Sequence, residues 1–278
     1  MERLKWRDGC NGHLEIDGIS LHFSCHGPDP SERPTIILLH EGLGCVELWR
    51  EFPKALSVRS NMGVFTYSRT GYGQSSAASL PRPLDYMTRE AVDILPLILD
   101  RIGFRRGILL GHSDGATIAA IYAGSIEDFR IRGLILIAPH FFSETEGLES
   151  IAMAKEAFDS GELRKKLAKY HTDPDTAFRG WNDAWLHPGF KEWNVADVID
   201  YFRIPVLAIQ GTNDQYGTMA QIAEIDSRIY SPLEMLLVEN CGHSPHKEKP
   251  EQTLTAIVEF VQRLERIENE KSTIPAQN

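Results

Sequence analysis

Six short, predominantly apolar runs recur along the 278-residue chain and constrain its fold more than any other feature. Each is the length of a strand, and none alternates apolar and polar residues as a strand with one wet face would. That pattern is typical of parallel strands covered on both faces. The runs lie at 35–39, 63–67, 107–110, 134–138, 205–209 and 233–238.

Helical patterns separate these runs, and they lie at 48–56, 84–102, 116–123, 219–228 and 250–267. Pro96 is expected to kink the second of them. Near the N-terminus, two alternating segments, 14–16 and 19–23, are joined by Asp17-Gly18, which predicts an antiparallel hairpin. The alternation of strands and helices predicts an α/β fold with a mostly parallel, doubly wound sheet and right-handed crossovers.

The segment 140–201 breaks the alternation, because it contains helical windows and three tryptophans but no strand-like run. Structureless loops of this length are uncommon in a domain. We therefore predict a helical lid inserted into one α/β body. The predicted division is a core of residues 1–139, a lid of residues 140–201, a second core part of residues 202–268 and a flexible tail of residues 269–278.

The charge balance excludes some function classes. The chain has 29 Lys and Arg against 39 Asp and Glu, a formal net charge of −10. Nucleic-acid binding requires clustered cations, so we expect no nucleic-acid partner. No run approaches the roughly 18 apolar residues of a membrane span, so we expect no membrane association. The first residues lack the apolar segment of a secretory signal, which favours a cytoplasmic protein.

The cysteines are widely scattered and form no CxxC pair, so we expect reduced thiols and no structural zinc site. They are Cys10, Cys25, Cys45 and Cys241. No acidic cluster indicates a metal, and we expect neither a metal nor a cofactor. The oligomeric state stays open, with a homodimer through the aromatic insertion as one alternative.

The sharpest local signal is the pentapeptide 111–115, Gly-His-Ser-Asp-Gly, which lies between a predicted strand and a predicted helix. This is the context of a GxSxG nucleophile elbow, in which a strained turn exposes the serine oxygen above the strand ends. Ser113 is therefore the candidate nucleophile.

A serine hydroxyl needs a general base, and the base needs an orienting carboxylate. Asp214 and His243 follow the last two predicted strands, at the sheet edge where open α/β sheets place their sites. They also follow Ser113 in the chain order that the elbow fold requires. The alternatives are His246 for the base and Asp226 or Asp200 for the acid, but these lie on or near predicted helices.

An acyl-transfer site also needs donors for an oxyanion. The backbone N–H of Asp114 is one candidate, because it directly follows the nucleophile. The second should come from the loop after the run 35–39, where Gly42 is the first choice and Leu43 the alternative. The Asp114 side chain is expected to stabilise the elbow.

Together these residues resemble the α/β-hydrolase superfamily over about residues 12–267. The resemblance rests on the elbow, the loop His-Glu-Gly-Leu-Gly at 40–44, the stretch 68–75 and Gly242-His243. The chain is similar to the lidded branch that contains esterases, C–C bond hydrolases and cofactor-free haloperoxidase-like enzymes. The resemblance implies that the stretch 68–75 forms a structural turn.

Two positions stand out against that family. Most relatives have Gly after the histidine of the oxyanion loop, where this chain has Glu41, and the sequence leaves its role open. Dehalogenases and epoxide hydrolases of the family use Asp at the nucleophile position, so Ser113 argues against both activities.

These observations predict a serine hydrolase that cleaves a carboxylic ester of a small, mostly apolar or aromatic substrate through an acyl-enzyme. The alternatives are a C–C bond hydrolase of a ring-cleavage diketone, which would use the same triad, and a ligand receptor on a hydrolase fold. The expected pocket residues are Leu43, His112, His140, Phe141, Trp181 and Trp185.

Overall fold

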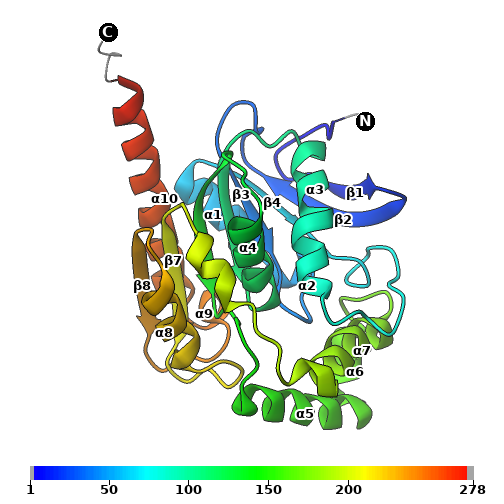
Figure 1. The fold of residues 1–278 in the computed structure, drawn as a ribbon. Helices are drawn as coiled ribbons and strands as arrows, with labels where there is room; N and C mark the ends of the chain where they lie inside the picture. The colour runs from blue at the N-terminus through cyan, green and yellow to red at the C-terminus, as the bar shows by residue number, and fades with distance from the viewer. Residues whose placement is uncertain (1–2, 274–278) are drawn as a thin grey trace.

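An eight-stranded sheet forms the centre of the computed structural model, which describes the backbone of residues 3–273 and the side chains up to residue 270 (Figure 1). The strand order is β1-β2-β4-β3-β5-β6-β7-β8. Pairing is antiparallel from β1 to β2 and from β2 to β4, and parallel from β4 to β8. The strands are β1 (Asn11–Ile16), β2 (Ile19–His26), β3 (Thr35–Leu39), β4 (Gly63–Tyr67), β5 (Gly107–His112), β6 (Ile131–Ile137), β7 (Val206–Gly211) and β8 (Leu233–Val238).

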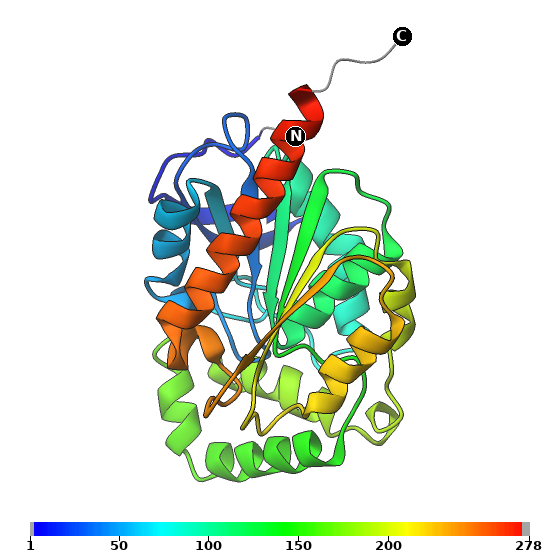
Figure 2. The same cartoon turned by 90° about the vertical axis from the view of Figure 1, so that its left-hand side faces the viewer.

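Helices cover both faces of the sheet, which confirms the predicted α/β class. Figure 2 shows α1 and α10 on one side, with α3, α4 and α8 on the other. The α-helices are α1 (Phe52–Ser60), α2 (Tyr86–Arg89), α3 (Leu95–Arg101), α4 (Asp114–Ser125), α5 (Thr145–Asp159), α6 (Glu162–Leu167), α7 (Pro174–Trp185), α8 (Met219–Arg228), α9 (Pro245–Glu248) and α10 (Pro250–Thr273). The shorter elements are the 3-10 helices η1 (Val46–Trp49), η3 (Pro188–Phe190) and η4 (Ala196–Tyr201) and the π-helix η2 (Glu90–Ile94).

The continuous apolar runs follow from burial on two faces. Ile37 and Leu39 of β3 belong to the core cluster beneath α3, α4 and α8. Ile36 and Leu38 belong to the second cluster, beneath α1 and α10. Because successive side chains of a strand point to opposite faces, both sets must be apolar. The edge strand β8 departs from the prediction, since its Met235 and Leu237 are exposed.

The hairpin at the N-terminus is confirmed, but the expectation of reduced thiols is wrong for two cysteines. Asp17 and Gly18 both have positive φ, as a two-residue hairpin turn requires. The β1–β2 register begins with Asn11 opposite Ser24, and the adjacent Cys25 N–H donates to the Cys10 carbonyl oxygen at 2.8 Å. Cys10 and Cys25 form a disulfide with a Cα–Cα distance of 5.5 Å. Cys45 and Cys241 are buried free thiols.

Two predicted helices are interrupted for local reasons. The predicted helix 48–56 is divided into η1 and α1, because Arg50 has φ of 52°. The predicted helix 84–102 contains the wide turn η2 directly before α3. Pro96 has no N–H to continue the helical ladder, which accounts for this irregularity.

The C-terminal helix is longer than predicted. Residues 269–273, expected in the tail, continue α10, whereas residues 274–278 lie outside the described part of the chain. Figure 1 shows α10 extending past the end of the sheet. Glu268 on this helix pairs with Arg106 and Arg132, with N–O distances of 3.6 and 3.3 Å.

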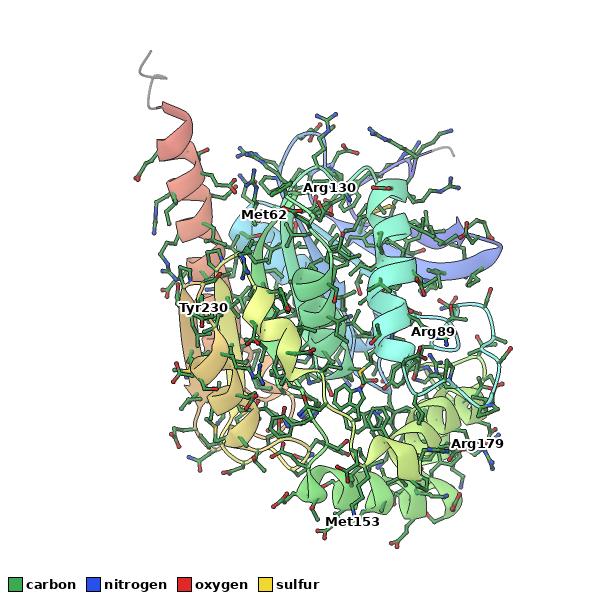
Figure 3. The ribbon with its side chains drawn as sticks, in the orientation of Figure 1. Met62, Arg89, Arg130, Met153, Arg179 and Tyr230 are labelled. Carbon is green, nitrogen blue, oxygen red and sulfur yellow. A yellow bond between two sulfur atoms is a disulfide. The ribbon has the colours of Figure 1, made fainter. Side chains whose placement is uncertain are left out.

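Helices α5, α6 and α7 lie across the end of the sheet that the parallel strands point toward (Figure 1). Helix α5 is two-sided: Ile151 is buried, while Met153 points outward from the molecule (Figure 3). Helix η4, near the end of this segment, packs closely against α4. The α4 residue Gly124 lies so near the η4 residue Val198 that a Cβ on Gly124 would be 2.3 Å from the Val198 carbonyl oxygen. No helix among residues 3–273 is long and apolar enough to cross a bilayer.

Candidate active site

Ser113 occupies a strained turn between β5 and α4. Its φ of 55° and ψ of −121° lie in a region that non-glycine residues rarely adopt. The turn requires close approach of backbones on both sides. A Cβ on Gly111 would lie 2.1 Å from the Gly115 carbonyl oxygen, and one on Gly115 would lie 2.0 Å from that of Leu39. Both positions therefore admit only glycine, as an elbow requires.

The structure brings Ser113, His243 and Asp214 into one hydrogen-bonded chain. His243 lies in the loop between β8 and α9, and its Nε2 is 2.8 Å from Ser113 Oγ. Its Nδ1 is 2.7 Å from Oδ2 of Asp214, which follows β7. The carboxylate can only accept, so the neutral ring carries its proton on Nδ1. Nε2 is then the acceptor for the serine hydroxyl.

The Asp214 carboxylate is fixed by further donors. The Tyr216 N–H lies 2.8 Å from Oδ1, and Gln210 Nε2 lies 2.9 Å from Oδ2. Burial acts to raise the pKa of Asp214, but the hydrogen bond and charge of His243 and the Tyr216 N–H hold that pKa below its ordinary value. Asp214 is therefore ionised at neutral pH.

The alternative base and acids lie elsewhere. His246 is buried, with its ring against Trp49 and His112 at centroid distances of 5.0 and 4.7 Å. Asp200 pairs with Arg228 at 2.9 Å, and Asp226 is exposed on α8. None of these three contacts Ser113.

The candidate oxyanion donors, the N–H groups of Gly42, Leu43 and Asp114, belong to residues that line the same cavity as Ser113. Asp114 opens α4, so its N–H has no acceptor within the helix. Among residues 3–273, neither the Gly42 nor the Leu43 N–H makes a main-chain hydrogen bond. The Asp114 carboxyl accepts from Tyr86 Oη at 2.5 Å and lies 4.0 Å from Arg69. Burial raises the pKa of this carboxyl, while Arg69 and Tyr86 oppose the rise.

A cavity of about 110 Å³ opens at the triad, under α5 and α7. Its walls are Glu41, Gly42, Leu43, Ser113, Asp114, His140, Ile151, Trp181, Trp185, Tyr216 and His243. Trp181 closes it over the oxyanion loop, because a Cβ on Gly42 would lie 2.3 Å from the indole. A larger cavity of about 610 Å³ lies at the far end of α4, and none of the predicted site residues lines it.

Four of the six residues expected in the pocket line this cavity, and two lie outside it. Leu43, His140, Trp181 and Trp185 line the cavity. His112 lies behind the triad instead, with Nε2 donating to the His243 carbonyl oxygen at 2.7 Å. Phe141 is fully buried, and its N–H donates to Gln221.

Three wall residues were not expected from the sequence: Glu41, whose role was left open, Ile151 and Tyr216. Ile151 lies on α5 within the predicted helical segment 140–201, where the apolar face of a helix was a usable signal. Tyr216 follows Asp214 by two positions, and its ring centroid lies 4.9 Å from that of His243.

His140 adds a buried imidazole beside the base. Its ring centroid lies 5.3 Å from Trp185 and 5.6 Å from His243. Burial, together with the neighbouring His243, lowers the pKa of His140 to about 3. The ring is therefore neutral at ordinary pH and adds no positive charge beside His243.

Comparison with known proteins concerns the family and the fold of the chain. Residues 36–256 match the profile described as Alpha/beta hydrolase family. The human (Lyso)-N-acylphosphatidylethanolamine lipase is 31% identical over 115 residues, which cover 41% of this chain and 33% of the lipase. The chain thus matches about a third of that protein's length. Epoxide hydrolase 3 of Xenopus tropicalis is 21% identical over 293 residues, covering 91% of this chain and 78% of that protein.

Among solved structures, one from Nitrososphaera gargenis, described with the activity profiles of its carboxylesterases, superposes with a TM-score of 0.73. The identity is 18%, and the match covers 92% of this chain and 99% of that one. This likeness concerns the fold. With the match to the family profile over most of its length, the chain belongs to the alpha/beta hydrolase family.

Proposed function

We propose that this chain is a serine hydrolase that cleaves the carboxylic ester of a small, mostly apolar or aromatic substrate through an acyl-enzyme on Ser113. The observation that carries the proposal is the chain of hydrogen bonds from Ser113 Oγ through His243 to Asp214, at 2.8 and 2.7 Å. Distances in this range allow direct proton transfer between nucleophile and base.

In the first half-reaction, His243 Nε2 takes the hydroxyl proton while Ser113 Oγ attacks the acyl carbon. The resulting imidazolium is stabilised by the ionised Asp214. The carbonyl oxygen becomes an oxyanion, which the N–H groups of Gly42 and Asp114 would bind. Collapse of this intermediate breaks the bond to the alcohol, and the leaving oxygen takes the proton from His243.

In the second half-reaction, His243 takes a proton from water, which attacks the acyl carbon of the acyl-enzyme. The oxyanion forms again at the same donors. Ser113 then leaves, recovers its proton from His243, and the acid is released. Each step uses the chain's own groups and water, so the proposal includes no cofactor.

The serine also separates this proposal from epoxide opening, the activity named for one relative. Attack of a serine oxygen on an epoxide carbon would give an ether, and an ether has no acyl carbon for water to attack. Attack on an ester gives a second ester, which water can cleave. Ser113 therefore favours an acyl substrate.

The walls of the cavity set the expected substrate size. Aromatic and aliphatic side chains of α5 and α7 close the space above Ser113, and the cavity of about 110 Å³ is well below the roughly 300–1,000 Å³ of drug-sized sites. We therefore expect a short or flat acyl group.

The test is hydrolysis of p-nitrophenyl acetate, butyrate and octanoate by wild-type protein and by Ser113→Ala. The expected loss in the variant is at least about 10³-fold in kcat, because the nucleophile is gone. Ser227→Ala, which removes an exposed hydroxyl on α8, is the matched control and should keep wild-type rates.

Covalent labelling separates an enzyme from a receptor on the same fold. A fluorophosphonate probe should label wild-type protein and fail to label Ser113→Ala. A folded wild-type protein that neither hydrolyses an ester nor takes the label would overturn the proposal. Turnover confined to a ring-fission diketone would replace it with C–C bond hydrolysis.

A further inference from the structure

Glu41 lies at the point where three loops of the site meet. It precedes Gly42 in the loop after β3, where the resemblance to the family predicts glycine. Lys247, on α9, follows His243 by four positions. The Glu41 Oε1 atom is 2.7 Å from Lys247 Nζ, and both side chains are largely shielded, with exposures of 17% and 32%. This contact joins the oxyanion loop to the loop that carries the base.

The carboxylate is charged in this environment. Burial acts to raise the pKa of Glu41, but the positive charge of Lys247 holds that pKa well below its ordinary value. Shielded ion pairs with hydrogen-bond geometry constrain the positions of both partners more strongly than exposed pairs do.

His112 ties the elbow to the loop that carries the base and lies beside Glu41. Its Nε2 lies 2.7 Å from the His243 carbonyl oxygen, and its Nδ1 lies 3.5 Å from Glu41 Oε2. A carbonyl can only accept, so Nε2 carries the proton. Burial lowers the pKa of His112 despite the opposing influence of Glu41, so the ring is neutral at ordinary pH. Lys247 is then the partner that holds the Glu41 carboxylate.

The main chain of Glu41 is fixed independently of its side chain. Its carbonyl oxygen accepts from His40 Nδ1 at 2.7 Å and from Arg69 Nη2 at 3.0 Å. This carbonyl and the Gly42 N–H belong to one planar peptide unit. Fixing the carbonyl therefore fixes the direction of the N–H, and Arg69, which is fully buried, cannot move away.

We propose that Glu41 and Lys247 are positioning residues that hold the oxyanion donor of Gly42 in register with His243. The inference rests on the proposed function, because it assigns a role within the same ester-cleaving site. Arg69 orients the donor peptide at one end of Glu41, and Lys247 fixes the other end to the base loop. The Glu41–Lys247 pair keeps the Gly42 N–H and His243 at a constant separation while the oxyanion forms between them.

The test compares Glu41→Gln, Lys247→Met and the double variant on a p-nitrophenyl ester that wild-type protein turns over. Each single variant should lose about 10- to 100-fold in kcat with KM within about threefold of wild type, because small displacements of donors slow chemistry more than binding. The double variant should be no slower than the worse single one. Lys247→Arg, which keeps the ion pair, should recover most of the rate.

A transition-state analogue distinguishes positioning from a general structural role. An aryl trifluoromethyl ketone adds to Ser113 and places an oxyanion at the same donors. Its affinity should fall in proportion to kcat/KM in Glu41→Gln, since it depends on the same geometry. The matched control removes the exposed Glu162–Lys166 pair of α6 with Glu162→Gln and Lys166→Met, and should leave both quantities unchanged.

The outcomes separate the two proposals. If wild-type protein shows no esterase activity, the rate of fluorophosphonate labelling still measures the reactivity of Ser113, and Glu41→Gln should lower that rate about 10-fold or more. If Glu41→Gln keeps the wild-type activity and the wild-type affinity for the analogue, the positioning role is overturned and the proposed function still stands. An equal loss of rate in the Glu162/Lys166 control would also overturn it. So would a fall in the melting temperature of Glu41→Gln large enough to account for its loss of rate.

Discussion

His243 Nε2 lies 2.8 Å from Ser113 Oγ, although 130 positions separate the two residues in the chain. Parallel strands whose carboxyl ends meet at one edge of the sheet bring them together. The base is held there from two directions, by Asp214 at Nδ1 and by His112 at its carbonyl oxygen. Substitutions at these supports should therefore affect the rate more than the fold.

Replacement of Asp214 by Asn should lower kcat by about 10³- to 10⁴-fold with a native fold. The amide has no charge to stabilise the imidazolium, and it no longer fixes the ring proton on Nδ1. The measurement is kcat on a p-nitrophenyl ester, with circular dichroism as a check of folding. Asp200→Asn, which removes a carboxylate from a solvent-exposed ion pair with Arg228, is the control. Equal rates for wild type and Asp214→Asn would remove Asp214 from the mechanism.

Trp181 should set the acyl length that the site accepts. Its indole packs directly on Gly42, and Trp181→Ala would extend the cavity toward α7. The ratio of kcat/KM for the octanoate ester to that for the acetate ester should rise at least about 10-fold, because each accommodated methylene contributes to binding of the transition state. Trp193→Ala, which alters a tryptophan stacked on Phe190 outside the cavity, should leave the ratio unchanged. An unchanged ratio in Trp181→Ala would show that another wall limits the acyl chain.

The local signals in the sequence predicted the fold and the elbow well for a physical reason. Each buried strand carries its own apolar run, and the elbow needs small residues at fixed offsets from Ser113. To bring Ser113, Asp214 and His243 together, the prediction needed only one further rule, that the carboxyl ends of parallel strands lie at the same edge of the sheet. The triad could thus be proposed without knowledge of any long-range contact.

The parts that sequence reasoning missed depend on contacts between distant segments. The disulfide of Cys10 and Cys25 follows from hairpin register, which cysteine spacing does not encode. His112 looked like a pocket residue, but its ring turns toward the His243 backbone 131 positions away. The role of Glu41 depends on Lys247, which lies 206 positions away. No local pattern indicates either pairing.

The packing of α4 on the sheet should tolerate no side chain at Gly115. A Cβ there would lie 2.0 Å from the Leu39 carbonyl oxygen, and the three nearest atoms are all backbone atoms that cannot rotate away. Gly115→Ala should lower the free energy of unfolding by at least about 2 kcal/mol, as overpacking in cores does. Chemical denaturation measures the change. Gly12→Ala is the control, since a Cβ at that position meets Phe23 at an ordinary 3.5 Å. A loss in Gly115→Ala no greater than in Gly12→Ala would contradict the close approach.

The buried His140 should make the protein less stable in acid. The unfolded chain binds a proton at this residue below its ordinary pKa of 6.5, whereas the native ring stays neutral until the pH approaches 3. The unfolded state therefore binds more protons in this window, and stability falls as the pH drops through it. At 1.4 kcal/mol per pH unit, the loss between about pH 6.5 and about pH 4.5 is on the order of 2–3 kcal/mol. Above pH 6.5 the ring is neutral in both states, so none of this stability is lost.

Replacement of His140 by Phe isolates this effect, because the variant keeps an aromatic ring against Trp185 but has no group to titrate. Urea denaturation at neutral pH and at about pH 4.5 should show a smaller loss of stability in His140→Phe than in wild type, by the amount that the shifted pKa gives. His187→Phe, at a histidine outside the cavity on the turn that leads into η3, should keep the wild-type dependence. The same slope in His140→Phe and wild type would mean that the native ring takes up its proton as readily as the unfolded chain does.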